Sequence, residues 1–223
     1  MERVDFIVYL ISAISAIVWI VGIVFSFITF RAKKEREKIK GLANTVGNSN
    51  IIIQLDPEAY KNMGNGFYDE GNYDKAIEYY TKAIELEPDF TSAYNAMGFS
   101  YYELGDYDKA IMCFQRAIAL DPTFALSYNG MGTAYYEKCN YNNAIECFLK
   151  AIKLKPDFAD AYNNLGNAYQ KISNYENALE CYKKAIELFP NNALPYNNMG
   201  IAYQNIGDKN KANDYFLKAK MMN

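Results

Sequence analysis

A spacing of 34 residues recurs along most of this 223-residue chain, and it constrains the fold more than any other feature. Four columns of identical residues repeat five times. They are Tyr60, Tyr94, Tyr128, Tyr162 and Tyr196; Gly64, Gly98, Gly132, Gly166 and Gly200; Ala76, Ala110, Ala144, Ala178 and Ala212; and Ala83, Ala117, Ala151, Ala185 and Ala219. A short unit that recurs at a fixed period is one supersecondary element, which buries its apolar face only by stacking on its neighbours.

The period divides the chain into five units, each of which we predict to be a pair of helices. We place the units at 57–90, 91–124, 125–158, 159–192 and 193–223. In the second unit, apolar or small residues recur three and four positions apart over 94–101 and again over 107–118. Gly105 supplies a turn between the two stripes, and Pro122 prevents the second helix from continuing.

The repeated small residues predict close helix packing. Gly and Ala leave room for two helices to approach, while Tyr and Phe of the facing helices fill the gaps. We expect Gly64 and Gly66, which lie inside a helical pattern, to be packing glycines of this kind. In the last unit, apolar columns of the second helix become polar at Lys209, Asn213 and Lys220. This predicts a terminal unit that faces water, so that the array ends near Asn223.

Each unit contains the spacing Tyr-x2-Met/Leu-Gly-x2-Tyr/Phe, followed by Ala-x3-Phe/Tyr-x2-Ala, and a proline closes the first four units. This pattern resembles the tetratricopeptide repeat (TPR) over the whole of 57–223. This chain has Tyr in all five units where the family usually has Trp. The resemblance implies an all-α fold, a right-handed superhelical α-solenoid of five helical hairpins. It also implies a concave groove, lined by the first helix of each unit, that binds peptides or partner proteins, and a role as an adaptor rather than an enzyme.

Side chains on the concave side are placed by their offset from the tyrosine column. The candidate groove residues are Lys61, Asn65, Tyr68, Asn95, Phe99, Tyr102, Asn129, Tyr136, Asn163, Asn167 and Asn197. An asparagine carries both a donor and an acceptor, so regularly spaced asparagines can bind an extended peptide backbone without reading its sequence. The alternative is that these asparagines only solvate the surface.

Two known ligand-binding patterns of the family match in part. The asparagines resemble the asparagine ladder of O-linked N-acetylglucosamine transferases, which lies one position later, where this chain has Asn62, Asn164 and Asn198. Lys61 and Asn65 match half of the clamp with which chaperone-binding TPR domains hold a carboxylate. Leu126 and Gly130 stand where the clamp needs cations, so this pattern is incomplete.

A membrane anchor precedes the repeats. Residues 6–30 form a run of 25 without a charged side chain. As a helix at ~1.5 Å per residue the run would span ~37 Å, more than the ~30 Å hydrocarbon core. A cleaved signal peptide has only ~7–15 apolar residues before a small-residue cleavage site, whereas the small residues here lie inside the run. We therefore predict a single transmembrane helix over 6–30, preceded by a short flank over 1–5.

The flanking charges predict the topology. Six basic side chains follow the run in residues 31–40, against one before it. Because basic residues stay on the cytoplasmic side, we expect the N-terminus outside and the repeats in the cytoplasm. Residues 31–40 are predicted to form a basic juxtamembrane helix that can also attract anionic lipid headgroups, and 41–56 a linker. A domain that faces outward is the alternative topology.

Several kinds of chemistry are excluded or disfavoured. The chain has no histidine, which removes His-based triads, general bases and metal ligands. Cys113, Cys147 and Cys181 share one column, and helical layers ~8–10 Å apart are too distant for disulfides, so we expect reduced thiols. No cofactor, metal site or enzymatic motif is predicted. Residues 57–223 carry 16 basic and 21 acidic side chains, a balance unsuited to nucleic acid.

These observations favour a membrane-anchored adaptor or scaffold that binds a partner protein or extended peptide in its groove. The alternative is a structural subunit that assembles into a homo-oligomer through its convex face or its anchor.

Overall fold

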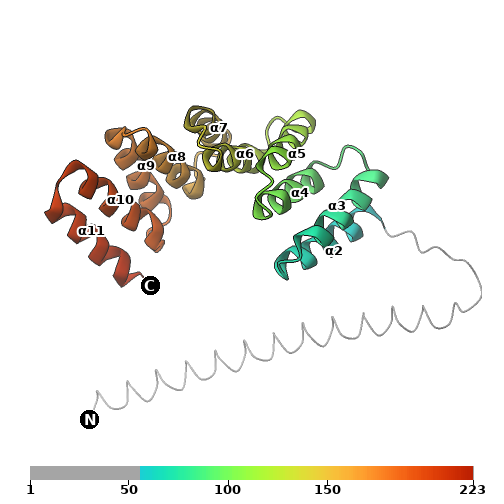
Figure 1. Ribbon diagram of the computed structural model, residues 1–223, viewed down its shortest axis with the longest axis horizontal. Coiled ribbons are helices and arrows are strands. Elements are labelled where there is room, and N and C mark those ends of the chain that lie inside the picture. The colour runs from blue at the N-terminus through green and yellow to red at the C-terminus, as the bar shows by residue number, and fades with distance from the viewer. Residues whose placement is uncertain (1–55, 223) are drawn as a thin grey trace, which may run out of the picture. The chain divides into compact units, whose positions relative to one another are not determined.

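The computed structural model describes residues 56–222, and within this range the protein is entirely α-helical (Figure 1). The helices pair into five consecutive hairpins, which confirms the predicted all-α stack of helical hairpins. Their bounds are α2 (Pro57–Asp69), α3 (Tyr73–Leu86), α4 (Thr91–Glu103), α5 (Tyr107–Leu120), α6 (Ala125–Glu137), α7 (Tyr141–Leu154), α8 (Ala159–Lys171), α9 (Tyr175–Leu188), α10 (Ala193–Ile206) and α11 (Lys209–Met221).

The hairpins stack in chain order, as Figure 1 shows from α2 to α11. Each helix packs on its hairpin partner, and the second helix of a unit packs on the first helix of the next unit. The first helices of successive units also contact one another, from α2 on α4 to α8 on α10. Among the described helices, contacts therefore run only between neighbouring units, as stacked repeats require.

The ring of Phe114 shows how the small residues permit this packing. Phe114 lies on α5 and is fully buried. A Cβ added to Gly98, in the same hairpin, would lie 2.7 Å from the ring, and one added to Gly130, in the next unit, would lie 2.6 Å from it. Neither position has room for a methyl group. One aromatic side chain thus fills the space between two first helices, and it joins two units.

The two glycines of α2 differ from one another. A Cβ on Gly64 would lie 2.5 Å from the Tyr80 ring, whereas a Cβ on Gly66 would have no atom within 4 Å. The expectation that both are packing glycines is wrong for Gly66. Positions two apart in a helix point to different sides of it, so only Gly64 faces the partner helix.

The second helix of every hairpin begins in the same way. An N-cap side chain accepts a hydrogen bond from the backbone N–H three residues later. These caps are Asn72, Asp106, Asn140, Asn174 and Asp208. The residue before each cap has a left-handed backbone, which is glycine in three units but Cys139 (φ 57°) and Ser173 (φ 61°) in the others. The turn geometry is therefore kept even where its favoured residue is missing.

The predicted anchor falls outside the described part of the chain. The flank 1–5, the transmembrane helix 6–30, the juxtamembrane helix 31–40 and nearly all of the linker 41–56 precede residue 56. Within residues 56–222, none of the helices has the length and apolar character needed to cross a bilayer. The anchor and the topology remain predictions.

Candidate functional site

A pocket of 340 Å³ opens between the first helices of units one and two. We call it the first groove pocket. Its lining comes mainly from α2 and α4, with Tyr80 of α3 behind them. The lining residues are Asn65, Tyr68, Tyr80, Asn95, Ala96 and Phe99. Four of the predicted groove residues thus meet around one cavity.

A second groove pocket, of 200 Å³, lies further along the same helical layer. It is bounded by α4, α6 and α8, with Phe148 of α7 contributing from the second layer. The lining residues are Tyr102, Thr133, Tyr136, Glu137, Phe148, Asn164 and Asn167. Three more predicted residues, Tyr102, Tyr136 and Asn167, therefore share a cavity. Both pockets combine aromatic walls with a few amide groups, which suits binding of a polypeptide segment.

Asn95, Asn129 and Asn163 connect neighbouring units. The Oδ1 atom of Asn95 accepts from the Ser127 hydroxyl at 2.8 Å. The Oδ1 atoms of Asn129 and Asn163 accept from the amide groups of the asparagines 35 residues later, at 3.2 and 2.9 Å. This contact between units is a third role, in addition to the ligand binding and the solvation that the sequence suggests. In hydrogen bonds among residues 56–222 these three side chains use only their carbonyl groups, so their Nδ2 donors remain for a ligand.

Asn65 and Asn167 hold buried tyrosines in place. The Tyr80 hydroxyl donates to Asn65 Oδ1 at 2.8 Å, and the Tyr182 hydroxyl donates to Asn167 Oδ1 at the same distance. Tyr182 also donates to Gln170 Oε1 at 3.1 Å. These bonds satisfy phenols that would be costly to bury alone, and they orient the amides that line the two pockets.

Four predicted residues are not part of the lining of the two groove pockets: Asn129 and Asn163, which bind the next unit, and Lys61 and Asn197. Lys61 forms an ion pair with Glu58 at 2.7 Å, and its Nζ lies 5.3 Å from the centroid of the Phe90 ring. The ammonium group is therefore held by its own neighbours. Asn197 is exposed and lines a different pocket near the end of α11.

Two glutamates that the sequence analysis did not select lie beside the groove tyrosines. The Tyr68 hydroxyl donates to Glu103 Oε1 at 3.4 Å, and the Tyr102 hydroxyl donates to Glu137 Oε1 at 3.5 Å. Burial, followed by the charge of the neighbouring glutamate, raises the pKa of Tyr68 and Tyr102 to about 12. Both phenols are therefore neutral donors at physiological pH. The signal available in the sequence was the Tyr-Glu pair that ends two successive first helices.

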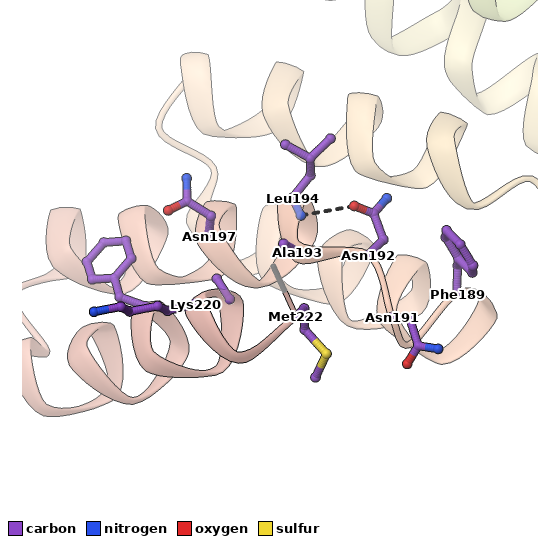
Figure 2. Close-up of a pocket in the computed structure, with 10 residues that line it drawn as sticks. Phe189, Asn191, Asn192, Ala193, Leu194, Asn197, Lys220 and Met222 are labelled. Atoms are coloured by element: carbon purple, nitrogen blue, oxygen red, sulfur yellow. Dashed lines mark hydrogen bonds between the residues drawn. The ribbon is translucent and has the colours of Figure 1, made fainter. Parts of the chain in front are cut away.

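The end pocket, near the last helix, has a volume of 650 Å³ (Figure 2). It lies between the loop that precedes α10, the start of α10 and the last turns of α11. Its lining residues are Phe189, Asn191, Asn192, Ala193, Leu194, Asn197, Phe216, Ala219, Lys220 and Met222. The backbone N–H of Leu194 donates to Asn192 Oδ1 at 3.0 Å across one side of it.

Repeat symmetry relates this pocket to a filled position inside the array. Ala193 and Ala219 occupy the positions that Ala125 and Ala151 hold in the third unit. There, Ala125 and Ala151 pack against Phe158, the buried residue just before the next unit's first helix. The end pocket thus corresponds to the position beside Ala125 and Ala151 that Phe158 fills in the third unit.

Comparisons with known proteins agree with this geometry. Three tetratricopeptide repeat family models match the chain, and together they cover 57–212. The matches are to one Tetratricopeptide repeat model at 57–90 and 159–192, to a TPR repeat model at 100–138 and 134–173, and to a second Tetratricopeptide repeat model at 79–112 and 181–212. No curated protein matches the chain.

Solved structures include relatives of similar length. A crystal structure of MamA is 30% identical with a TM-score of 0.64, and the match covers 71% of this chain and 93% of that one. MamA 41-end from Desulfovibrio magneticus RS-1 is 23% identical (TM-score 0.67, 74% and 94% covered), and pilF from Pseudomonas aeruginosa is 23% identical (TM-score 0.69, 75% and 76% covered). The last two show a shared fold. Repeat pattern, hairpin stack and family matches together place this chain in the tetratricopeptide repeat family.

Proposed function

We propose that this protein is a membrane-anchored adaptor that binds an extended segment of a partner protein in its concave groove, without catalysis. The observation that carries the proposal is the pair of groove pockets, which gather aromatic and amide side chains from the first helices of four successive units. TPR domains are typically scaffolds for protein interactions, and the family assignment supports the same function.

The asparagine side chains of the groove are held in place in the absence of a ligand. The carbonyl groups of Asn129 and Asn163 are engaged by the next unit, which fixes the orientation of both side chains. Their Nδ2 groups can then donate to backbone carbonyls of a peptide. Because the donors are held in place, little side-chain entropy is lost on binding. The tyrosine and phenylalanine walls receive the ligand's apolar side chains.

The anchor would bring the bound partner to a bilayer. The uncharged run at 6–30 is long enough to cross the hydrocarbon core, and the six basic residues of 31–40 favour a cytoplasmic position for the repeats. The same basic residues would be attracted to anionic lipid headgroups at the membrane surface.

The variants Asn129→Asp and Asn163→Asp test the groove. Aspartate keeps an oxygen acceptor for the next unit but removes the amide donor. We expect a peptide selected from a random pool on the full-length chain to bind the double variant ~10-fold more weakly, as two lost hydrogen bonds predict. The control, Asn142→Asp with Asn210→Asp, adds the same charge at exposed positions of second helices. Equal binding by the native chain and the groove variant would contradict the proposed site.

The same peptide tests the anchor when vesicles are floated on a density gradient. The full-length chain should carry the peptide into the floating fraction. A chain without residues 1–40 should bind the peptide equally but remain in the dense fraction, since α2 to α11 pack only on one another within the described residues. Flotation of the shortened chain would overturn the anchoring role.

A second function, assembly of several copies, is favoured by the end pocket. Phe189 and Leu194, which line it, are 54% and 62% exposed and present apolar surface to a partner. Residues 56–90 carry nine acidic and three basic side chains, whereas 193–222 carry four basic and two acidic ones. The first unit of a second copy therefore complements the last unit in charge.

Sedimentation of the full-length chain in an uncharged detergent tests this assembly. We expect the sedimentation coefficient to rise with protein concentration, and the rise to disappear in Leu194→Asp, which places a charge in the end pocket. Leu217→Asp is the matched control, because Leu217 is 61% exposed and lies on α11 outside the pocket lining. A single species at all concentrations would exclude assembly through this surface.

A further inference from the structure

The first helices of units two and three have an unusual charge distribution. Each of α4 and α6 carries only one charged side chain, and in both it is a glutamate at the last helical residue, Glu103 and Glu137. The C-terminal end of a helix already bears about half a negative charge. The two carboxylates therefore stand where a helix favours a cation, along one edge of the groove.

No cation of the described chain neutralises these two carboxylates. Glu103 and Glu137 are both exposed, and neither forms an ion pair with another residue of 56–222. Lys138, next to Glu137 in sequence, pairs with Asp108 instead. Each carboxylate instead accepts a hydrogen bond from the tyrosine of the preceding unit, Tyr68 or Tyr102. Each site thus presents an aromatic ring beside a carboxylate that lacks a cationic partner within the described residues.

In the fourth unit, a cation of the protein itself lies beside the corresponding tyrosine ring. Lys171 is the residue of α8 that corresponds to Glu103 and Glu137. Its Nζ lies 5.9 Å from the centroid of the Tyr136 ring. This distance is within the range of a cation–π contact. Tyr136 follows Tyr68 and Tyr102 at the same position of the repeat. The third of these three tyrosines therefore already contacts an ammonium group, that of Lys171.

The first groove pocket adds a backbone-binding group beside the first of these sites. Asn95 lines the pocket and is only 9% exposed. Its Oδ1 accepts from the Ser127 hydroxyl, so within the described residues its Nδ2 group remains as a donor. A polypeptide carbonyl is the natural acceptor for this amide.

We propose that the N-terminal half of the groove selects an extended peptide with two lysine or arginine side chains about three residues apart. One cation lies over the Tyr68 ring and beside the Glu103 carboxylate, the other over the Tyr102 ring and beside the Glu137 carboxylate, and both tyrosine–glutamate hydrogen bonds remain. The spacing follows because packed helices lie ~8–10 Å apart and a peptide in the polyproline II conformation advances ~3.1 Å per residue. Such a chain has about three residues per turn, so side chains three apart lie on the same side of it. The inference rests on the proposed peptide-binding function and names the chemistry of its ligand.

The test compares two fluorescent peptides that differ only at two positions. One carries Lys-x-x-Lys in a neutral polar sequence, and the other has norleucine in place of both lysines, which keeps the carbon chain. On the full-length chain in an uncharged detergent, we expect the lysine peptide to bind ~10-fold more tightly, the sum of two exposed ion pairs and two cation–π contacts. The difference should shrink at high ionic strength, because salt screens exposed charges.

The variant Glu103→Gln with Glu137→Gln should lose the preference for lysine while it keeps its binding of the norleucine peptide. Glutamine retains the acceptor for the tyrosine hydroxyl. The control, Glu146→Gln with Glu180→Gln, makes the same change in net charge on exposed second-helix positions and should keep the preference. Equal affinity for both peptides on the native chain would overturn the selection of cations and leave peptide binding intact. Absence of binding of either peptide, together with an empty random-pool selection, would overturn peptide binding itself.

Discussion

Alanine at Gly64 is expected to destabilise the protein by ~1–3 kcal/mol, whereas alanine at Gly66 is expected to stabilise it by up to ~1 kcal/mol. The two positions lie in the same helix, α2, and the substitution is the same. They differ in what the added methyl group meets. Beside Gly64 the nearest atom of the Tyr80 ring would be 2.5 Å away, but beside Gly66 no atom lies within 4 Å.

The Tyr80 ring cannot easily withdraw from that contact. Its side chain is 1% exposed, and its hydroxyl is bonded to Asn65 Oδ1 at 2.8 Å. The methyl group at Gly64 would therefore push α2 away from α3 or break this bond. At Gly66 the methyl group meets only solvent, and the gain is the lower backbone entropy of alanine in the unfolded chain.

Urea unfolding of the full-length chain in an uncharged detergent, followed by circular dichroism, measures both effects. The two transition midpoints should move in opposite directions from that of the native chain. A Gly64→Ala variant as stable as the Gly66→Ala variant would show that the helices of the first hairpin do not pack as closely as described.

Alkylation of the folded protein is expected to modify one of its four cysteines and to spare the other three. Cys139 lies in a hairpin turn and is exposed, whereas Cys113, Cys147 and Cys181 are buried on second helices. Burial raises the pKa of each of these three thiols from an ordinary 9.0 to about 12. Since only the thiolate reacts, the reactive fraction at neutral pH falls on the order of 1000-fold. Brief treatment with iodoacetamide should therefore modify Cys139 alone.

Mass spectrometry of the intact chain counts the added groups. We expect one group on the folded protein, four in denaturant, and none on the folded Cys139→Ser variant. Rapid addition of four groups to the folded protein would contradict the buried positions of the three column cysteines.

The same thiols predict sensitivity to alkali. The folded protein keeps them neutral above their ordinary pKa of 9.0, whereas the unfolded chain ionises them there. Their contribution to stability is thus complete below pH 9.0 and is lost as the pH approaches about 12. The raised pKa values of Tyr68 and Tyr102 act in the same direction. The urea midpoint should therefore fall steadily above about pH 9.

Local pattern alone was sufficient to predict the hairpins of this protein. The period of 34 residues, the apolar stripes at helical spacing and the prolines after the second helices predict paired helices that stack. The same periodicity identified the face of the first helix on which Tyr68, Phe99 and Tyr136 lie. Such information is local, because which side of a helix a residue occupies depends only on its position along that helix.

Contacts between units could not be predicted in this way. The sequence predicts ligand or solvent contacts for Asn129 and Asn163, whereas in the structure their carbonyl groups bind the next unit. Glu103 was not among the predicted site residues. It lies 35 residues after Tyr68 and accepts a hydrogen bond from the Tyr68 hydroxyl. The contacts of the Lys61 ammonium group with Glu58 and the Phe90 ring were likewise not predictable from the periodicity.

The chain by itself therefore determines a stack of helical hairpins with amides and aromatic rings on one face. Tertiary structure alone decides which of those groups are used within the protein and which are left for a ligand. The physical reason is that a hydrogen bond between successive units requires two atoms to come within about 3 Å, and that depends on the spacing and angle between packed helices. Neither quantity is encoded in the periodicity of a single unit.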